Sequence, residues 1–113
     1  MIRNLLSALA LAATAASATA QVQFEECTLV GARGYGTVHA QCGTLERPEN
    51  PDEPDGTMIE LAVAKIASLA PEPLPDAFTV INGGPGGSSI ELHADMAAAF
   101  QSIRRERDII IID

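Results

Sequence analysis

The sequence predicts an α/β fold in which a hairpin of two strands precedes a strand–helix–strand unit. Residues 37–45 and 57–66 are apolar, strand-like segments on either side of an acidic, proline-rich loop. Further along, a short β-branched segment and the four isoleucines 109–112 enclose a stretch with helical spacing. A buried strand, a helix and a second buried strand in succession are typical of a parallel sheet.

The first half of the chain gives the hairpin. Residues 21–36 contain three glycines and show no clear period, so we expect an irregular segment there. The strand over 37–45 leads into residues 46–56, which hold three prolines, five acids and an Asp-Gly turn signal and therefore predict a loop. In 57–66 both faces are mostly apolar, which favours a strand covered on both sides.

The second half gives the parallel unit. Prolines 71, 73 and 75 predict an extended connection over 67–76, and a third strand is expected at 77–81. Ser88 and Glu91 have the capping-box spacing that starts a helix. Its predicted core stripe follows at helical spacing and comprises Leu92, Met96, Phe100 and Ile103. The isoleucines lack a period of two, which predicts a parallel strand buried on both faces.

The first 20 residues have the pattern of a secretory signal peptide. A positive start, an apolar run and Ala18-Thr19-Ala20 predict cleavage after Ala20, leaving residues 21–113 as the folded part. We therefore expect a secreted or periplasmic protein with no membrane association after cleavage. The formal net charge is −8 without a basic patch, which argues against nucleic acid or an anionic membrane as partner.

Two cysteines, Cys27 and Cys42, lie in the exported part, where a disulfide is the expected state. It would close a loop of about 15 residues and contribute roughly 3 kcal/mol in the chain-entropy model. A metal site formed by Cys27, His39 and Cys42 is the alternative, although no metal-ligand spacing is present.

The sheet predicted from these elements is incomplete. The isoleucine strand would be the last of about four and would have an unprotected edge, which complete proteins cover or charge. We therefore expect the sequence to be the N-terminal part of a domain of ~250 residues or more.

The most distinctive motif is the loop 82–88, Asn-Gly-Gly-Pro-Gly-Gly-Ser. Glycines bring bare N–H groups close to a ligand, and a helix start behind them favours an anion. One interpretation is dinucleotide binding, since Gly84-x-Gly86-x-x-Ser89 nearly matches the fingerprint and Asp113 ends the next strand, where a ribose-binding acid would lie. A P-loop is excluded because no lysine follows the glycines.

The other interpretation is an oxyanion hole, one donor of which comes from the loop between the third strand and the first helix of α/β-hydrolases. Loop 82–88 and Arg107–Asp113 after one helix resemble the proline iminopeptidase and tripeptidyl aminopeptidase-like α/β-hydrolases. Residues 40–48 and 56–64 resemble the first two strands of that family. The resemblance covers about residues 27–113 and implies the N-terminal part of an α/β-hydrolase fold.

The resemblance implies a role for each matching residue. Gly84 would donate its backbone N–H to the oxyanion, and Gly83, Pro85 and Gly86 would shape the turn. Asn82 stands where many relatives have histidine, and Asp113 matches the acid that opens the Asp-x-Arg-Gly-x-Gly segment of the family. The implied protein is an exported serine hydrolase that releases N-terminal residues from peptides, with a peptide or small acyl substrate and neither cofactor nor metal.

The nucleophile and the rest of the triad are not expected in this chain. There is no Gly-x-Ser-x-Gly, and Ser88 and Ser89 are better explained as helix caps. His39 lies in a strand, and His93 is predicted to be a solvated surface residue. Residues 1–113 alone are therefore predicted to lack catalysis. The alternatives are an esterase or lipase of the same fold, a dinucleotide-dependent oxidoreductase, and an exported binding module without catalysis.

Overall fold

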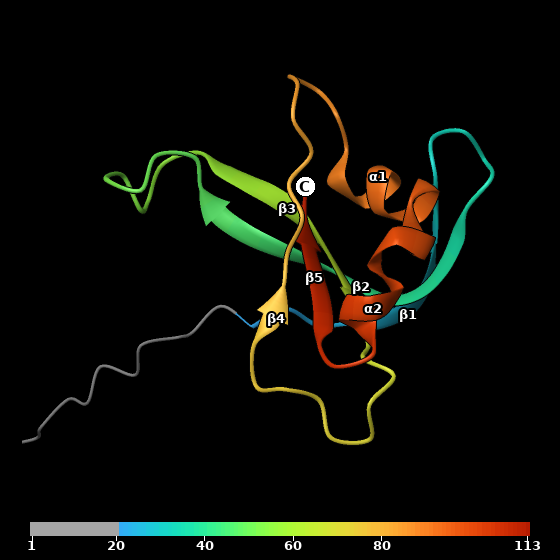
Figure 1. The fold of residues 1–113 in the computed structure, drawn as a ribbon. Helices are drawn as coiled ribbons and strands as arrows, with labels where there is room; N and C mark the ends of the chain where they lie inside the picture. Colours follow the sequence, from blue (N-terminus) through green and yellow to red (C-terminus); the bar gives the residue numbers. More distant parts are fainter. Residues whose placement is uncertain (1–20) are drawn as a thin grey trace, which may run out of the picture.

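The computed structural model describes residues 21–113, which form one sheet with a helical segment packed on it (Figure 1). The predicted signal peptide, residues 1–20, lies outside the described residues. The sheet has five strands in the order β1-β2-β3-β5-β4. In chain order the strands are β1 (Glu25–Val30), β2 (Thr37–Pro48), β3 (Met58–Ile66), β4 (Ala77–Phe78) and β5 (Asp108–Ile112).

The pairing of the strands agrees with the predicted arrangement of a hairpin followed by a parallel unit. β2 and β3 form a long antiparallel hairpin, and β4 pairs in parallel with β5 after the intervening helical segment. β3 and β5 are antiparallel, which makes the sheet mixed. This arrangement is compatible with part of an α/β fold.

One strand was not expected from the sequence. Residues 21–36, predicted to be irregular, contain β1, which pairs with β2 in the register Cys27 opposite Ala40. Only Leu29 of this strand is buried, so the segment lacks the apolar alternation by which a strand is recognised. The predicted disulfide between Cys27 and Cys42 joins β1 to β2. The alternative metal site is wrong because the disulfide occupies both thiols.

The isoleucine strand β5 has two neighbours, β3 and β4, so it is not the edge strand that the sequence led us to expect. Ile109 and Ile111 are fully buried beneath the helical segment. On the other face Ile110 is half-buried and Ile112 is 47% exposed. Within residues 21–113 the strand is therefore buried on one face only, and the prediction of burial on both faces is not met.

The single predicted helix is broken into three short pieces: α1 (Ser89–Asp95), the 3₁₀ turn η1 (Ala97–Phe100) and α2 (Gln101–Arg104). The break is at Met96, whose φ of −115° and ψ of 19° leave the helical region. Met96 is 48% exposed, so the predicted stripe through this residue is wrong. The buried face of α1 consists instead of Ser89, His93 and Ala94.

The core lies between this helical segment and one face of the sheet. Its members are aliphatic side chains from β1, β2, β3, β5 and α1. They are Leu29, Val38, Ala40, Ala64, Ile66, Ala94, Ile109 and Ile111. Half-buried side chains that include Phe78, Phe100 and Ile103 close its rim.

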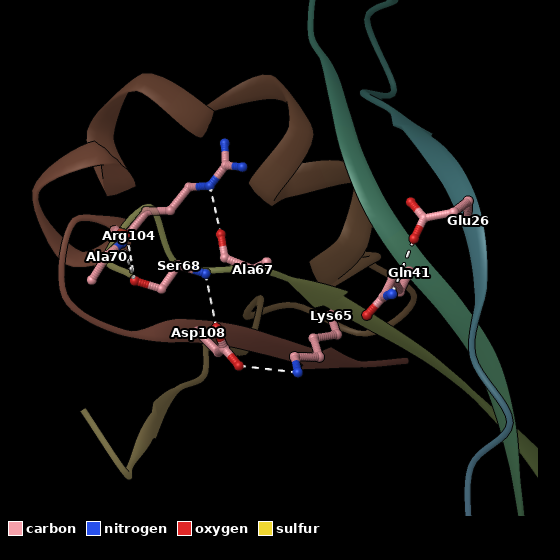
Figure 2. Close-up of polar contacts among 8 residues, drawn as sticks. All are labelled: Glu26, Gln41, Lys65, Ala67, Ser68, Ala70, Arg104 and Asp108. Carbon is pink, nitrogen blue, oxygen red and sulfur yellow. Dashed lines mark hydrogen bonds and ion pairs between the residues drawn. The ribbon is translucent and has the colours of Figure 1, made fainter. Parts of the chain in front are cut away.

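A polar cluster fixes the end of β3 to the start of β5 (Figure 2). The Asp108 carboxylate accepts a 2.8 Å hydrogen bond from the amide of Ser68 and pairs with Lys65 Nζ at 3.1 Å. Arg104 Nε donates to the Ala67 carbonyl at 2.9 Å, which ties α2 to the same corner.

Candidate functional site

The glycine loop connects β4 to α1 and rises beyond the end of β5 that is marked C in Figure 1. Residues 83–87 are exposed. β4 ends at Phe78, three residues before the predicted end at Ile81. The chain leaves the sheet early. The backbone N–H of Asn82 donates a 3.0 Å hydrogen bond to Ser89 Oγ rather than to a neighbouring strand.

The loop is built around a turn that only glycine suits. Gly87 N donates to the Gly84 carbonyl at 3.3 Å, which closes a four-residue turn with Pro85 second and Gly86 third. Gly86 has a φ of +83°, as the third position of a type II turn requires. Gly84 also has a positive φ, +91°, and open space where a Cβ would stand. The loop therefore depends on its glycines at these two positions.

The turn leaves backbone donors unused. Among residues 21–113 the N–H groups of Gly83, Gly84 and Gly86 donate to no protein acceptor. An exposed loop with unused amides can donate to an anion or to a developing oxyanion. The geometry thus places Gly84, the predicted donor, at a position where its N–H can meet a ligand.

The start of α1 is capped as the sequence predicted. Ser88 is the N-cap, and its Oγ accepts from the Glu91 amide at 3.0 Å. Ser89 is 4% exposed, and its Oγ accepts from Asn82 as described above. Both hydroxyl oxygens therefore accept hydrogen bonds from backbone N–H groups. Neither serine is hydrogen-bonded to a histidine within the part of the chain that the structure describes.

A second acceptor at the helix start comes from Asp113, directly after β5. Its carboxylate accepts from Ser89 N at 2.7 Å, from Ile90 N at 3.1 Å and from Ser88 Oγ at 2.5 Å. Partial burial acts to raise the pKa of Asp113. The hydrogen bonds from these three residues outweigh that effect and hold the pKa below its ordinary value.

This contact argues against the dinucleotide interpretation. A pyrophosphate would need the amides at the helix start, but the carboxylate of Asp113 already occupies those of Ser89 and Ile90. The same carboxylate would repel the phosphates, and both of its oxygens already accept hydrogen bonds from the helix start. The glycine loop itself remains open to a smaller or transient anion.

The histidines do not form a catalytic pair. His39 lies in a strand, β2, as predicted, and is exposed. His93, predicted to be solvated, is 2% exposed and stacks on Phe100 with ring centroids 5.0 Å apart. Burial and, secondarily, the charge of Arg104 lower the pKa of His93. The prediction failed because it placed Leu92 and Met96 on the buried face of the helix, whereas the buried face of α1 is formed by Ser89, His93 and Ala94.

The two hollows described next do not bring together a nucleophile, a base and an acid. A hollow of about 280 Å³ lies beside the glycine loop and is lined by Asn82, Gly86, Ser88, Arg33 and other residues of the β1–β2 turn and α1. A larger hollow of about 540 Å³ is lined mainly by residues of β2 and β3 and by none of the glycine loop. Residues 21–113 contain no cluster of side chains suited to hold a metal, and none of their helices is long and apolar enough to cross a bilayer.

Comparison with known proteins gives a match to hydrolases. Over 76 residues the chain is 34% identical to carboxylesterase B of Mycobacterium tuberculosis and to a protein of Mycobacterium bovis that is named a hydrolase. The match covers 66% of this chain but 14% of each relative, so the chain spans a small part of their length. No protein-family model matches the chain. The chain is thus similar to hydrolases, and the comparison does not reach the narrower peptidase family.

Proposed function

We infer that this chain supplies the oxyanion loop of an exported serine hydrolase with an α/β-hydrolase fold, and that Gly84 is the donor. The observation that carries the proposal is the unused Gly84 amide in a turn between β4 and the start of α1. The similarity to proteins named as hydrolases supports the same class of reaction. The disulfide between Cys27 and Cys42 supports an oxidising compartment and hence export.

In this proposal a serine elsewhere in the whole protein attacks the acyl carbon of the substrate. The carbonyl oxygen gains negative charge as the tetrahedral intermediate forms, and the Gly84 N–H donates a hydrogen bond to it. One such donor contributes ~10²–10³ in turnover. Gly83, Pro85 and Gly86 set the direction of that N–H through the turn, and no cofactor or metal takes part.

The resemblance of the glycine loop favours a peptide substrate, from which N-terminal residues would be released. An ester substrate is the second candidate, because the relative from Mycobacterium tuberculosis is named a carboxylesterase. Both substrates pass through the same tetrahedral intermediate, so the role of Gly84 is common to the two. They differ in the leaving group, which residues 82–88 do not contact in this mechanism.

The test uses the protein expressed from its complete gene. Turnover is measured on aminoacyl and tripeptidyl p-nitroanilides and on p-nitrophenyl esters, with the wild type, Gly84→Ala and Gly34→Ala. Gly34 has a φ of +71° and open space around it, so the control carries similar backbone strain in the β1–β2 turn. Gly84→Ala keeps a backbone N–H, but a Cβ is disfavoured at the Gly84 φ of +91° and should turn that N–H away from the oxyanion. We therefore expect kcat to fall by up to about 10²–10³, whereas Gly34→Ala should keep it.

Two results would overturn the proposal. One is equal turnover in the wild type and Gly84→Ala. The other is resistance of the wild type to serine-directed phosphonates together with saturable binding of a nicotinamide dinucleotide, which would establish the oxidoreductase alternative. The ratio of amide to ester turnover in the wild type decides between peptidase and esterase.

A further inference from the structure

We propose that Asp113 is a positioning residue for the Gly84 amide, acting through Ser89 and Asn82; the proposal rests on the function inferred above. The observation behind it is a continuous chain of hydrogen bonds from the sheet to both ends of the glycine loop. Asp113 touches neither Gly84 nor the expected place of the substrate. Its effect would be exerted through the hydrogen bonds of Ser88, Ser89 and Asn82.

The first link fixes Asp113 itself. Its N–H donates to the Ala62 carbonyl and its carbonyl accepts from the Ala62 N–H, each at 2.9 Å. This pair continues the ladder between β3 and β5 and gives the carboxylate a fixed origin on the sheet. From there both carboxylate oxygens receive donors from the first turn of α1, with Ser89 N on one and Ile90 N and Ser88 Oγ on the other.

The second link runs from the helix start to the beginning of the loop. Ser89 is buried, and its hydroxyl oxygen accepts from the Asn82 amide at 3.0 Å. The Asn82 side chain returns the contact, since its Nδ2 donates to the Ser88 carbonyl at 3.3 Å. Asn82 and Ser88 bracket residues 83–87, so the two ends of the loop are held against each other.

The loop has little else to hold it. Residues 83–87 are exposed, and Cβ atoms placed on Gly83, Gly84 or Gly86 would meet nothing within 4 Å. Packing therefore does not set the direction of the Gly84 N–H, which leaves the hydrogen bonds at the base and the internal turn. Misplacement of a catalytic group by about 1 Å can cost on the order of 10²-fold in rate. A loosened base should thus reduce turnover without removing the donor.

The chain offers a matched control on the same strand. Asp108 begins β5 and caps the Ser68 amide, whereas Asp113 follows the strand and caps α1 (Figure 2 shows the Asp108 end). Asp113→Asn and Asp108→Asn each replace an anchored carboxylate by a neutral side chain of the same shape. Only the first change lies in the chain of contacts to the glycine loop.

The experiment uses the protein from its complete gene and measures kcat, KM, melting temperature and the ³¹P chemical shift of a serine-bound phosphonate. We expect Asp113→Asn to lower kcat by about 10–100-fold with KM nearly unchanged, and to move the ³¹P signal. Asp108→Asn should lower the melting temperature but keep kcat and the ³¹P signal. Ser89→Ala, which removes the acceptor for the Asn82 amide, should behave like Asp113→Asn and decides the case if that variant does not fold.

The outcomes separate the two proposals. A wild type that neither hydrolyses acyl substrates nor reacts with the phosphonate overturns the proposed function. An active wild type with unchanged kcat in Asp113→Asn and Ser89→Ala overturns the positioning role alone. Equal losses of kcat in Asp113→Asn and Asp108→Asn also overturn it, because the effect would then reflect general destabilisation.

Discussion

The imidazole of His93 stacks on the ring of Phe100, with the ring centroids 5.0 Å apart and the ring planes inclined by 20°. Both ring nitrogens are buried without a hydrogen-bond partner among residues 21–113. Burial first, and the positive charge of Arg104 second, lower the pKa of His93 from its ordinary value of 6.5. Burial and the neighbouring charge therefore favour the neutral form of the imidazole in the folded protein.

This burial predicts a loss of stability in acid. Below pH 6.5 the unfolded chain takes up a proton on His93 that the folded protein does not, so the stability contribution is complete above pH 6.5 and falls as the pH drops toward the lower folded-state pKa. The melting temperature of the wild type should fall as the pH is lowered from 8 to 5. His93→Leu should reduce the size of that fall. His39→Gln, at an exposed site on β2, is the control and should keep it. The same pH dependence in His93→Leu and the wild type would contradict the account.

The turn in the glycine loop predicts a difference between two glycines. Gly86→Ala should destabilise the protein by about 1–2 kcal/mol, because its φ of +83° disfavours any residue with a Cβ. Gly83 has open space and lies outside the positive-φ glycines, so Gly83→Ala should be nearly neutral. Urea unfolding of both variants measures the difference. A larger loss in Gly83→Ala than in Gly86→Ala would show that the turn is formed differently.

The disulfide predicts a dependence on redox conditions. Cys27 and Cys42 are 15 residues apart and join β1, a strand with one buried side chain, to β2. The double variant Cys27→Ser/Cys42→Ser should lose roughly 3 kcal/mol of unfolding free energy, since the unfolded chain regains its loop entropy. A reductant should lower the stability of the wild type and leave that of the double variant unchanged. Equal sensitivity of the two proteins would argue against a stabilising cross-link.

The corner formed by Asp108 predicts a further loss on truncation of its side chain. Asp108→Ala leaves the Ser68 amide without its acceptor and Lys65 without its ion pair, which should cost about 1.5–3 kcal/mol.

The hydrogen bond from Ser68 is the main cause of the lowered pKa of Asp108, with Lys65 adding to it against the opposing effect of burial. Stability from this group is therefore present above pH 3.8 and is lost as the pH falls through the lower folded-state pKa. Unfolding at pH 7 and pH 3 should show a smaller difference between variant and wild type in acid. A difference that stays the same at both pH values would contradict this assignment.

Local patterns in the sequence were enough to predict the hairpin, the parallel unit, the disulfide and the Ser88 cap. Each of these depends on residues close in sequence or on a pattern with a clear period. β1 escaped prediction because its side chains are mostly exposed, and the helix break at Met96 escaped because spacing alone cannot show where a hydrogen-bond ladder stops. The burial of His93 was missed because spacing alone did not show which face of α1 packs on the sheet.

The candidate site divides in the same way. The composition of residues 82–88 and their place before a helix predicted the glycine loop. The hydrogen bonds from the start of α1 to the Asp113 carboxylate were not predicted. They join the residue after β5 to Ser89, which lies 24 residues earlier in the chain. The sequence signal available for it was an acid directly after the isoleucine strand, which the dinucleotide interpretation also uses. Only the hydrogen bonds of the carboxylate distinguish a ribose-binding acid from an acid that holds the start of α1.

The most direct test of the central claim is a crystal structure of the protein from its complete gene with a serine-bound phosphonate. The distance to be measured joins the Gly84 amide nitrogen to the phosphonyl oxygen. We expect a hydrogen bond of about 2.7–3.1 Å between these atoms. A phosphonyl oxygen that is bound by other donors, with the Gly84 N–H turned away from it, would contradict the account.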